Sequence, residues 1–202
     1  MKLYYTPGAC SLSPHIALYE SGLEFEAIKV EHGTGLLPDG KKFKEVNSLG
    51  YVPLLELDDG GQLIEGPAIV QYISDLVPDK QLAPANGTFA RYQLQSWLNF
   101  ISTELHKGFS SIFSTINPDE IKDKWRVSLK NRFSWVDENL SRHPYLMGDA
   151  YTVADAYLLT VSNWSNLANL DIKDLDHLQS FRRRILSRSA VHSAMKAEGL
   201  IM

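Results

Sequence analysis

The chain has 202 residues, 44% hydrophobic and 22% charged, with four Trp, nine Tyr and eight Phe, a composition typical of a folded globular protein and not of a disordered one. Its formal net charge of -4 argues against the broad basic surface that nucleic-acid binding requires, so we expect no nucleic-acid partner. No apolar run is long enough for a membrane span or a signal-peptide core, which predicts a cytoplasmic protein without membrane contact.

The first 77 residues alternate between strand and helix patterns. Gly22 is expected to end the first helix, and the Asp58-Asp59-Gly60 turn separates the last two strands. The order predicts a small α/β domain at 1–77 that is too short for a dinucleotide-binding fold. The expected strands are 2–5, 25–31, 52–57 and 61–65, and the expected helices are 13–22 and 66–77.

A stretch rich in proline and glycine, 78–87, predicts a linker to a second domain. Beyond it, apolar residues recur with helical spacing, so we expect an all-helical domain at 88–202. The apolar face of one long helix is Leu94, Trp97, Leu98, Ile101, Leu105, Phe109 and Ile112, and that of another is Trp125, Leu129, Phe133, Val136 and Leu140.

A further helix is predicted at 151–159, where the sequence carries its own start signal. Thr152 is a suitable N-cap, and the side chain of Asp155, three residues later, can accept a hydrogen bond from the N–H of Thr152. A buried carboxylate in so apolar a segment is costly unless it is bonded. We therefore interpret Asp155 as a helix cap and not as a catalytic group.

Cys10 is the only cysteine, and it lies between the Pro7-Gly8 turn and the first predicted helix. The dipole and unpaired N–H groups of a helix N-terminus favour a thiolate, which predicts a pKa below the value of about 8.5 of a free thiol. Ser13 stands where a C-x-x-C motif has its second cysteine, so any disulfide partner must come from outside. On the thiol alone, a reactive cysteine and an inert small residue remain equally open.

Two further features suit a short peptide ligand. A cis bond at Val52-Pro53 would turn the backbone of Val52 outward for antiparallel pairing with an extended peptide, although a proline that simply begins a strand is equally compatible. Glu65 and the N–H of Gly66 stand at a helix N-terminus, where they can hold an ammonium and a carboxylate.

A polar stripe follows the first long helix. At about 100° per residue, Asn99, Thr103 and His106 fall within about 60° of one another, opposite the apolar face. Such a stripe is usually a solvated surface, and it forms a site only where it borders a cleft.

Five segments, in this order and with these separations, resemble a bacterial glutathione transferase of the beta class, most closely those of aromatic-degradation pathways of the biphenyl type. The similarity covers essentially the whole chain. It implies a thioredoxin-like domain at 1–77, an all-helical domain at 88–202, a homodimer, and glutathione as a cosubstrate, with no metal and no permanently bound cofactor. The segments are KLYYTPGACSLSPHIAL, GYVPLLEL, EGPAIVQYI, LNFISTELHK and YTVADAYL.

The resemblance also implies roles for individual residues. Cys10 would face the glutathione sulfur and could form a mixed disulfide with it, with His106 as its polar neighbour. Val52 would pair with the cysteinyl backbone of the tripeptide through a cis Pro53. The other implied glutathione contacts are Tyr51, Glu65, Gly66, Asn99, Thr103, Glu104 and Leu105.

Two positions depart from the pattern that the resemblance implies. Gly66 replaces a serine, which keeps the backbone N–H but removes a hydroxyl. Gly35 replaces a lysine for the glycyl carboxylate of glutathione. His32, Lys41 or Lys42 are the candidates to substitute for that lysine.

The sequence therefore predicts a glutathione transferase that acts on small hydrophobic electrophiles. The implied reaction extends to glutathione-dependent dehalogenation of chlorinated aromatic breakdown products. Two alternatives remain open. One is a glutaredoxin-like thiol-disulfide transferase, which Cys10 and Ser13 would permit, and the other is a non-catalytic glutathione-binding module.

Overall fold

The computed structural model describes residues 1–202 and divides into two compact units. The first unit contains Met1–Ala83 together with Arg188–Met202, and the second contains Pro84–Ser187. This division differs at the C-terminal end from the expected helical domain at 88–202. The last helix of the chain clusters with the first unit because it packs against that unit's first helix.

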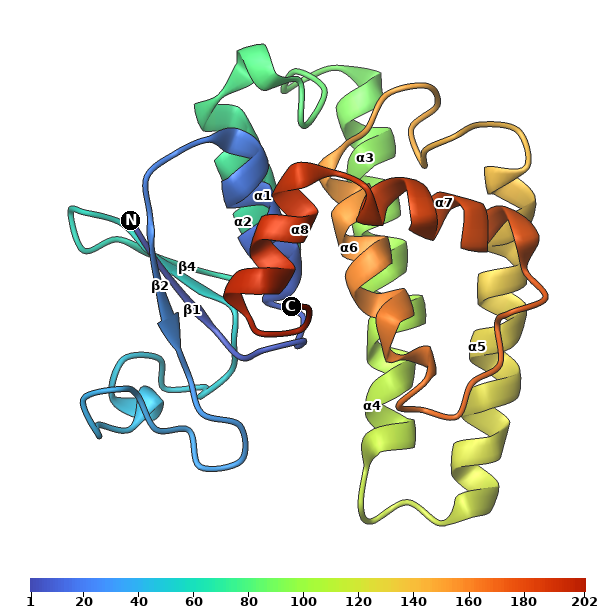
Figure 1. Cartoon of the computed structure of the whole chain (residues 1–202), viewed down its shortest axis with the longest axis horizontal. Helices are drawn as coiled ribbons and strands as arrows, with labels where there is room; N and C mark the ends of the chain where they lie inside the picture. The colour runs from blue at the N-terminus through green and yellow to red at the C-terminus, as the bar shows by residue number, and fades with distance from the viewer. The chain divides into compact units, whose positions relative to one another are not determined.

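The first unit is built on a four-stranded sheet with the order β2-β1-β3-β4 (Figure 1). Its β1 strand runs parallel to β2 and antiparallel to β3, and β3 is antiparallel to β4. The strands are β1 (Lys2–Tyr5), β2 (Glu26–Lys29), β3 (Leu54–Glu56) and β4 (Gln62–Ile64), and the helices that pack against each other beside the sheet are α1 (Leu12–Ser21) and α2 (Gly66–Leu76). This is the expected thioredoxin-like arrangement. The β1 strand has the predicted bounds, and the other three strands are shorter than the sequence predicted.

Alternation of side chains along the strands produces two apolar layers. Leu3 and Leu55 are partners in the register of β1 and β3, and both are fully buried. On the opposite face, Tyr4 and Leu54 form a second cluster with Val30 and Phe43, against which Val52 packs. The segment between β2 and β3, which contains the 3-10 turn Phe43–Glu45, thus anchors the chain just before the Val52-Pro53 bond.

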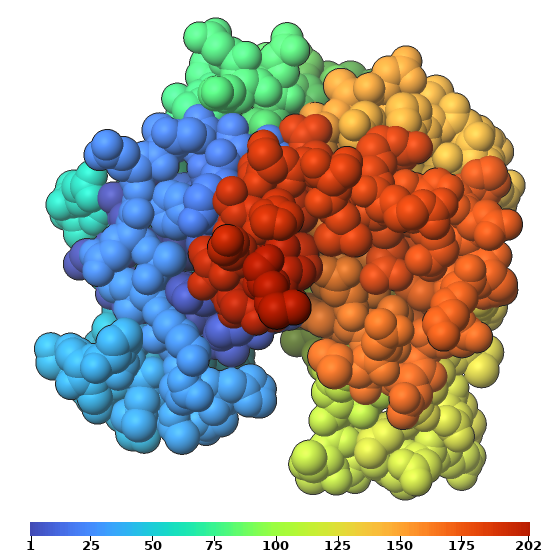
Figure 2. Space-filling view, viewed as in Figure 1, coloured from blue at the N-terminus to red at the C-terminus, as the bar shows by residue number.

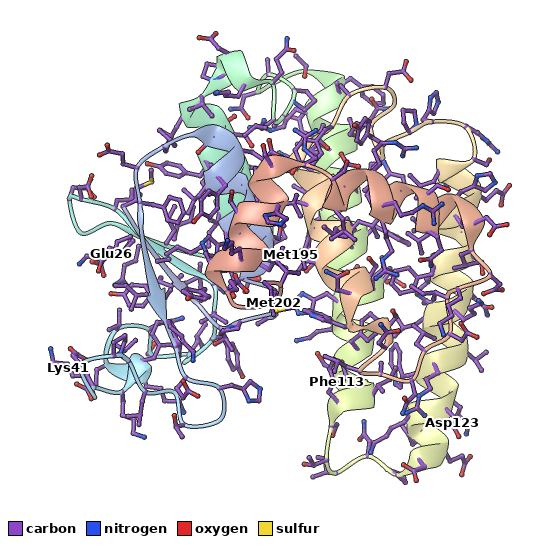
Figure 3. All side chains as sticks on the ribbon, viewed as in Figure 1. Glu26, Lys41, Phe113, Asp123, Met195 and Met202 are labelled. Atoms are coloured by element: carbon purple, nitrogen blue, oxygen red, sulfur yellow. The ribbon has the colours of Figure 1, made fainter.

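The C-terminal helix α8 (Ser189–Ala197) packs against α1. Arg188 begins this segment and binds the carboxylate of Glu20 on α1 through two N–H groups, at 2.6 and 3.0 Å. The red residues of α8 lie beside the blue residues of α1 at the molecular surface in Figure 2, and Figure 3 labels Met195 and Met202 in this segment.

The second unit is helical. A long helical run consists of α3 (Phe89–Phe100), a π-helical segment (Ile101–His106) and α4 (Lys107–Phe113), and it is followed by α5 (Asp119–Leu140), α6 (Val153–Ser162) and α7 (Asp176–Leu186). The predicted apolar faces are buried except for Trp97 and Trp125, which are partly exposed. Short 3-10 turns occur at Pro78–Lys80 and Asn163–Ser165. None of the helices has both the length and the apolar composition of a membrane span.

The start of α6 confirms the capping role of Asp155. The N–H of Thr152 donates to Asp155 Oδ2 at 2.7 Å, and the N–H of Leu146 donates to Oδ1 at 2.9 Å. The carboxylate is fully buried but accepts backbone hydrogen bonds on both oxygens. It therefore holds the preceding loop as well as the helix end.

Candidate active site

A compact turn between β1 and α1 holds Cys10. The Oγ of Ser11 accepts the N–H of Thr6 at 3.1 Å and donates to the carbonyl oxygen of Thr6 at 3.2 Å, which closes the turn. Gly8 adopts the left-handed conformation that the turn requires (φ 72°), and its N–H donates to Glu198 Oε2 at 2.8 Å. Cys10 thus lies just before α1, as the sequence predicted, although the helix begins at Leu12, one residue earlier than expected.

The half-buried thiol of Cys10 donates a hydrogen bond to the carbonyl oxygen of Val52, with an Sγ–O distance of 3.3 Å. The structure therefore brings together two of the predicted site residues.

The expected acidity of Cys10 is contradicted. Burial raises the pKa of the Cys10 thiol to about 11, and the negative charges of Glu65 and Glu198 act in the same direction. The backbone N–H groups of Cys10 and Ser11 lower the pKa, as expected at a helix start, but desolvation is the larger effect. Near pH 7 the free protein therefore carries a neutral thiol at this position.

The backbone at Val52-Pro53 has the predicted features. The peptide bond is cis, and the N–H of Val52 has no hydrogen-bond partner in the chain. A Cβ atom added to Gly66 would have Pro53 Cγ as its nearest neighbour, at 4.0 Å. Pro53 therefore places the start of β3 against the N-terminus of α2, where Glu65 and Gly66 lie.

Glu65 has a left-handed backbone conformation (φ 69°, ψ 113°), which is uncommon for a residue with a side chain. Its carbonyl oxygen accepts the N–H groups of Ala68 and Ile69 at 3.0 Å, which begins α2. The exposed Glu65 carboxylate makes no hydrogen bond or ion pair within the chain. A strained backbone beside an unpaired carboxylate is a combination that occurs at ligand-binding positions.

Sequence reasoning missed Asn47, which shapes the loop before Val52. Its side chain is buried, and Nδ2 donates to the carbonyl oxygen of Tyr51 at 2.8 Å while Oδ1 accepts the N–H of Leu49 at 3.2 Å. Tyr51 itself is 72% exposed, so its ring is in solvent. The short polar Asn three residues before Gly50 is a turn signal that could have indicated this role.

The three candidates to substitute for the lysine that the resemblance implies at position 35 either interact with other groups of the chain or are exposed. Lys41, labelled in Figure 3, pairs with Asp39 at 3.1 Å, and Lys42 donates to the carbonyl oxygen of Thr34 at 3.2 Å. His32 is exposed. Sequence reasoning did not consider Lys44, whose aliphatic stem crosses Gly50 so closely that a Cβ added there would lie 3.0 Å from its Cγ and Cε.

In the second unit, His106 ends the π-helical segment and lies against α6. Its Nδ1 is 2.7 Å from the Oη of Tyr157, and its ring centroid is 4.9 Å from that of Trp164. Burial lowers the pKa of His106 to about 4, and the charge of Lys107 acts in the same direction. His106 is therefore neutral near pH 7.

The π-helical segment corrects the expected geometry of the polar stripe. Asn99 and Thr103 are exposed, and the Thr103 hydroxyl donates to the Asn99 carbonyl oxygen at 3.1 Å. His106 instead contacts α6, because a spacing of 100° per residue does not hold through a π turn. π-helical turns occur frequently at functional sites.

The other two predicted residues of this segment differ in their surroundings. Glu104 accepts a hydrogen bond from Arg132 Nε on α5 at 2.6 Å, a partner that sequence reasoning missed. The side chain of Leu105 is fully buried in the unit. Leu105 as a whole residue has no solvent-exposed surface, which argues against the expected contact with glutathione.

Aromatic side chains extend from His106 along α4. Trp164 stands edge-on to Phe109 with a centroid distance of 5.6 Å, and Phe109 stacks with Phe113 at 5.9 Å. Phe113, labelled in Figure 3 at the end of α4, is 45% exposed. The cluster of His106, Phe109, Phe113 and Trp164 thus combines an apolar wall with one neutral imidazole.

Comparison with known proteins gives consistent matches along the chain. The family model for the glutathione S-transferase N-terminal domain matches residues 1–75, and that for the C-terminal domain matches residues 100–189. Glutathione S-transferase GstA of Escherichia coli O157:H7 is 44% identical over 200 residues, which cover 99% of this chain and 100% of that protein.

Two solved structures are similar over nearly their whole length. A ternary complex of BphK, described as a bacterial GST, has a TM-score of 0.96 and 55% identity, covering 98% of this chain and 100% of that one. A bacterial beta class glutathione S-transferase of Sphingomonas chungbukensis has a TM-score of 0.96 and 42% identity, covering 100% of both chains.

Proposed function

Since the chain belongs to the glutathione S-transferase family, and to its bacterial beta class, we propose that it transfers the glutathione sulfur to small hydrophobic electrophiles. The observation that carries the proposal is the contact between Cys10 and Val52. It joins the lone thiol to a stretch of backbone whose N–H is unpaired and can bond to an extended peptide.

Glutathione would lie across the first unit with its cysteinyl backbone on Val52. The unpaired N–H of Val52 would donate to a carbonyl of the tripeptide. Its γ-glutamyl end would reach α2, where the Glu65 carboxylate binds the ammonium group and the N–H of Gly66 binds the carboxylate. Pro53 supports this arrangement because it lies against Gly66.

We assign the glycyl carboxylate to Lys44. Its stem lies across Gly50, two residues before Val52, and its ammonium group has no partner in the chain. Lys41 and Lys42 are less suitable because each already bonds within its own loop.

The attacking sulfur in this proposal is that of glutathione. The Cys10 thiol, with a pKa near 11, is neutral near pH 7 and can donate a hydrogen bond to an anionic sulfur but is a poor nucleophile itself. The same property argues against a glutaredoxin-like exchange as the main activity, since that reaction needs a Cys10 thiolate.

The acceptor is assigned to the aromatic cluster of His106, Phe109, Phe113 and Trp164. Phe113 is the exposed ring of the cluster, and it stacks on the buried Phe109, so this surface suits an apolar, aromatic electrophile. With a chlorinated ring-cleavage product, the glutathione thiolate would form a carbon–sulfur bond while chloride leaves with the electron pair of the carbon–chlorine bond. Glutathione-dependent dehalogenation is thus one form of the same transfer.

We also propose that the protein is a homodimer. In this dimer, glutathione would be contacted by the exposed Asn99 and Thr103 and by the neighbouring Glu104. These polar groups support the proposal because Asn99 and Thr103 are exposed and Glu104 is held in place by Arg132. Sedimentation velocity would measure the oligomeric state. A monomer that remains fully active at assay concentration would contradict a shared site.

The proposed function is tested by retention on immobilised glutathione followed by turnover of 1-chloro-2,4-dinitrobenzene, chlorinated ring-cleavage products and a glutathione mixed disulfide. We expect retention, release of chloride with the chlorinated substrates, and faster conjugation than disulfide exchange. Retention without any turnover would instead support the non-catalytic binding module. Faster disulfide exchange would support the glutaredoxin-like alternative.

A further inference from the structure

The ring of His106 is held on two sides within the second unit. Tyr157, a buried residue of α6, places its Oη 2.7 Å from His106 Nδ1, with the two rings edge to face at 85°. Trp164 lies against the ring at 4.9 Å and 69°. Turning the ring over would replace Nδ1 by a carbon atom and lose the bond to Tyr157, so the two nitrogens of His106 have distinct surroundings.

The second nitrogen of the ring has no partner. His106 Nε2 makes no hydrogen bond within the chain. It is not one of the buried side-chain atoms that lack a hydrogen-bond partner, so it can be reached from solvent. Whatever His106 offers to a reacting molecule must therefore be offered by Nε2. Its chemical character depends on which nitrogen carries the proton, because a neutral imidazole has one donor and one acceptor.

The hydroxyl of Tyr157 decides between these two forms. A phenol O–H is a stronger acid than the N–H of a neutral imidazole, and a bare imidazole nitrogen is a good acceptor for it. Donation from Tyr157 leaves Nδ1 without a proton. We propose that Tyr157 holds His106 as the Nε2–H tautomer, so that the imidazole presents a neutral N–H donor and not a general base.

This assignment gives His106 a specific task. An N–H donor stabilises an anionic sulfur, or negative charge that develops on a leaving group, without removing a proton. The low pKa of His106 supports the assignment, because burial and the charge of Lys107 keep the ring from becoming a cation. Tyr157 is then a positioning residue that acts through His106. This functional part rests on the proposed glutathione transfer, whereas the tautomer itself does not.

Nuclear magnetic resonance of the full-length chain tests the tautomer directly. In a protein with 15N-labelled histidines, two-bond proton–nitrogen correlations distinguish the Nδ1–H and Nε2–H tautomers. The chain has six histidines, and the signals of His106 are those that disappear in His106→Gln. We expect the Nε2–H pattern near pH 7 in the free protein. The Nδ1–H pattern, or a histidine cation, would overturn the proposal whether or not the protein is an active transferase.

Tyr157→Phe tests whether the phenol is the cause. We expect His106 to become a mixture of tautomers, while Tyr92→Phe, which removes a hydroxyl from an exposed tyrosine of α3, leaves the pattern unchanged. An unmixed Nε2–H pattern in folded Tyr157→Phe would show that another group sets the tautomer. If that variant does not fold, the wild-type spectrum still decides which tautomer is present.

Kinetics test the functional part. In Tyr157→Phe we expect kcat to fall about fivefold, with little change in KM for glutathione and a higher midpoint pH for ionisation of the bound glutathione thiol. His106→Gln, whose amide N–H can replace Nε2–H, should retain more activity than the shorter His106→Asn. Equal activity of the Gln and Asn variants, or an unchanged ionisation midpoint in Tyr157→Phe, would contradict a donor role for His106.

Discussion

His15 Nδ1 lies 2.8 Å from Glu198 Oε1, and neither side chain has any exposure to solvent. The second carboxylate oxygen of Glu198 accepts the N–H of Gly8 at 2.8 Å, in the turn that leads to Cys10. Glu198 follows α8, so the C-terminal segment is bonded both to the turn before the thiol and to the helix after it. The surroundings of Cys10 therefore include a buried carboxylate from the far end of the sequence.

Replacing Glu198 by Gln should lower the pKa of the Cys10 thiol below its wild-type value of about 11. The negative charge of Glu198 raises that pKa, and the amide oxygen of Gln can still accept the Gly8 N–H. The rate of alkylation by iodoacetamide as a function of pH, followed by intact mass, measures the midpoint.

Glu20→Gln is the matched control. It removes another carboxylate that joins α1 to the start of α8, in this case through Arg188. An unchanged midpoint in Glu198→Gln would contradict an electrostatic effect of this carboxylate. A wild-type midpoint near the value of about 8.5 of a free thiol would contradict the dominance of burial.

Glu198→Ala should also destabilise the first unit by about 2 kcal/mol, because it leaves His15 and the Gly8 N–H without their buried acceptor. Urea unfolding measures the change in the free energy of unfolding, provided that its dependence on urea concentration (the m-value) is the same in both proteins. Asp58→Ala provides the contrast, since Asp58 forms an exposed pair with the N-terminus and its loss should have little effect. Equal destabilisation by the two substitutions would argue against a structural role for the buried pair.

The features that the sequence predicted well depend on local interactions. Spacing of apolar residues identified α2 and α5, and the Thr152–Asp155 pair marked the start of α6 because a capping box is formed within four residues. The Val52-Pro53 bond is cis, which is one of the two possibilities that the local sequence left open and the one that the resemblance implied. Each of these signals is contained in one short segment.

The features that were missed depend on residues far apart in the chain. Packing of α8 on α1 brings Glu198 to Gly8, which no periodicity could indicate. The acidity expected for Cys10 follows from its place before a helix, but burial outweighs that effect and is known only from the folded structure. The π turn at 101–106 likewise coincides with contacts to other helices, through Glu104 to α5 and His106 to α6.

His106 should make the protein sensitive to acid. Its folded-state pKa of about 4 lies below the value of about 6.5 of an unfolded histidine, so between these values the unfolded chain binds a proton that the folded chain does not. The free energy of unfolding contributed by this group is present above pH 6.5 and is lost as the pH falls towards 4.

Urea unfolding at pH 7 and pH 4 measures the loss. From pH 7 to pH 4, wild type should lose about 2 kcal/mol more than His106→Gln, which has no titrating group at this position. His143→Gln is the control because His143 is largely exposed. If wild type and His106→Gln lose the same stability, the imidazole is not buried as the structure places it.

Gly66→Ser should tighten glutathione binding. Gly66 does not have a left-handed backbone, and an added Cβ would meet only Pro53 Cγ at 4.0 Å, so serine fits without strain. Its hydroxyl can donate to the γ-glutamyl carboxylate, which should lower KM for glutathione about threefold. Gly66→Ala adds the Cβ without the hydroxyl and should leave KM nearly unchanged. A similar gain in both variants would show that helix stability, and not the hydroxyl, is responsible.

Lys44→Met should weaken glutathione binding in a way that depends on the glycyl end of the ligand. If the Lys44 ammonium group binds the glycyl carboxylate, its loss removes a charge-assisted hydrogen bond and should raise KM for glutathione about tenfold. With γ-glutamylcysteine, which lacks the glycine, wild type and Lys44→Met should have nearly the same KM. Lys41→Met is the control, because Lys41 pairs with Asp39 in its own loop. An equal rise in KM for both thiols would instead indicate that Lys44 supports the loop before Val52, and no rise for either would remove Lys44 from the site.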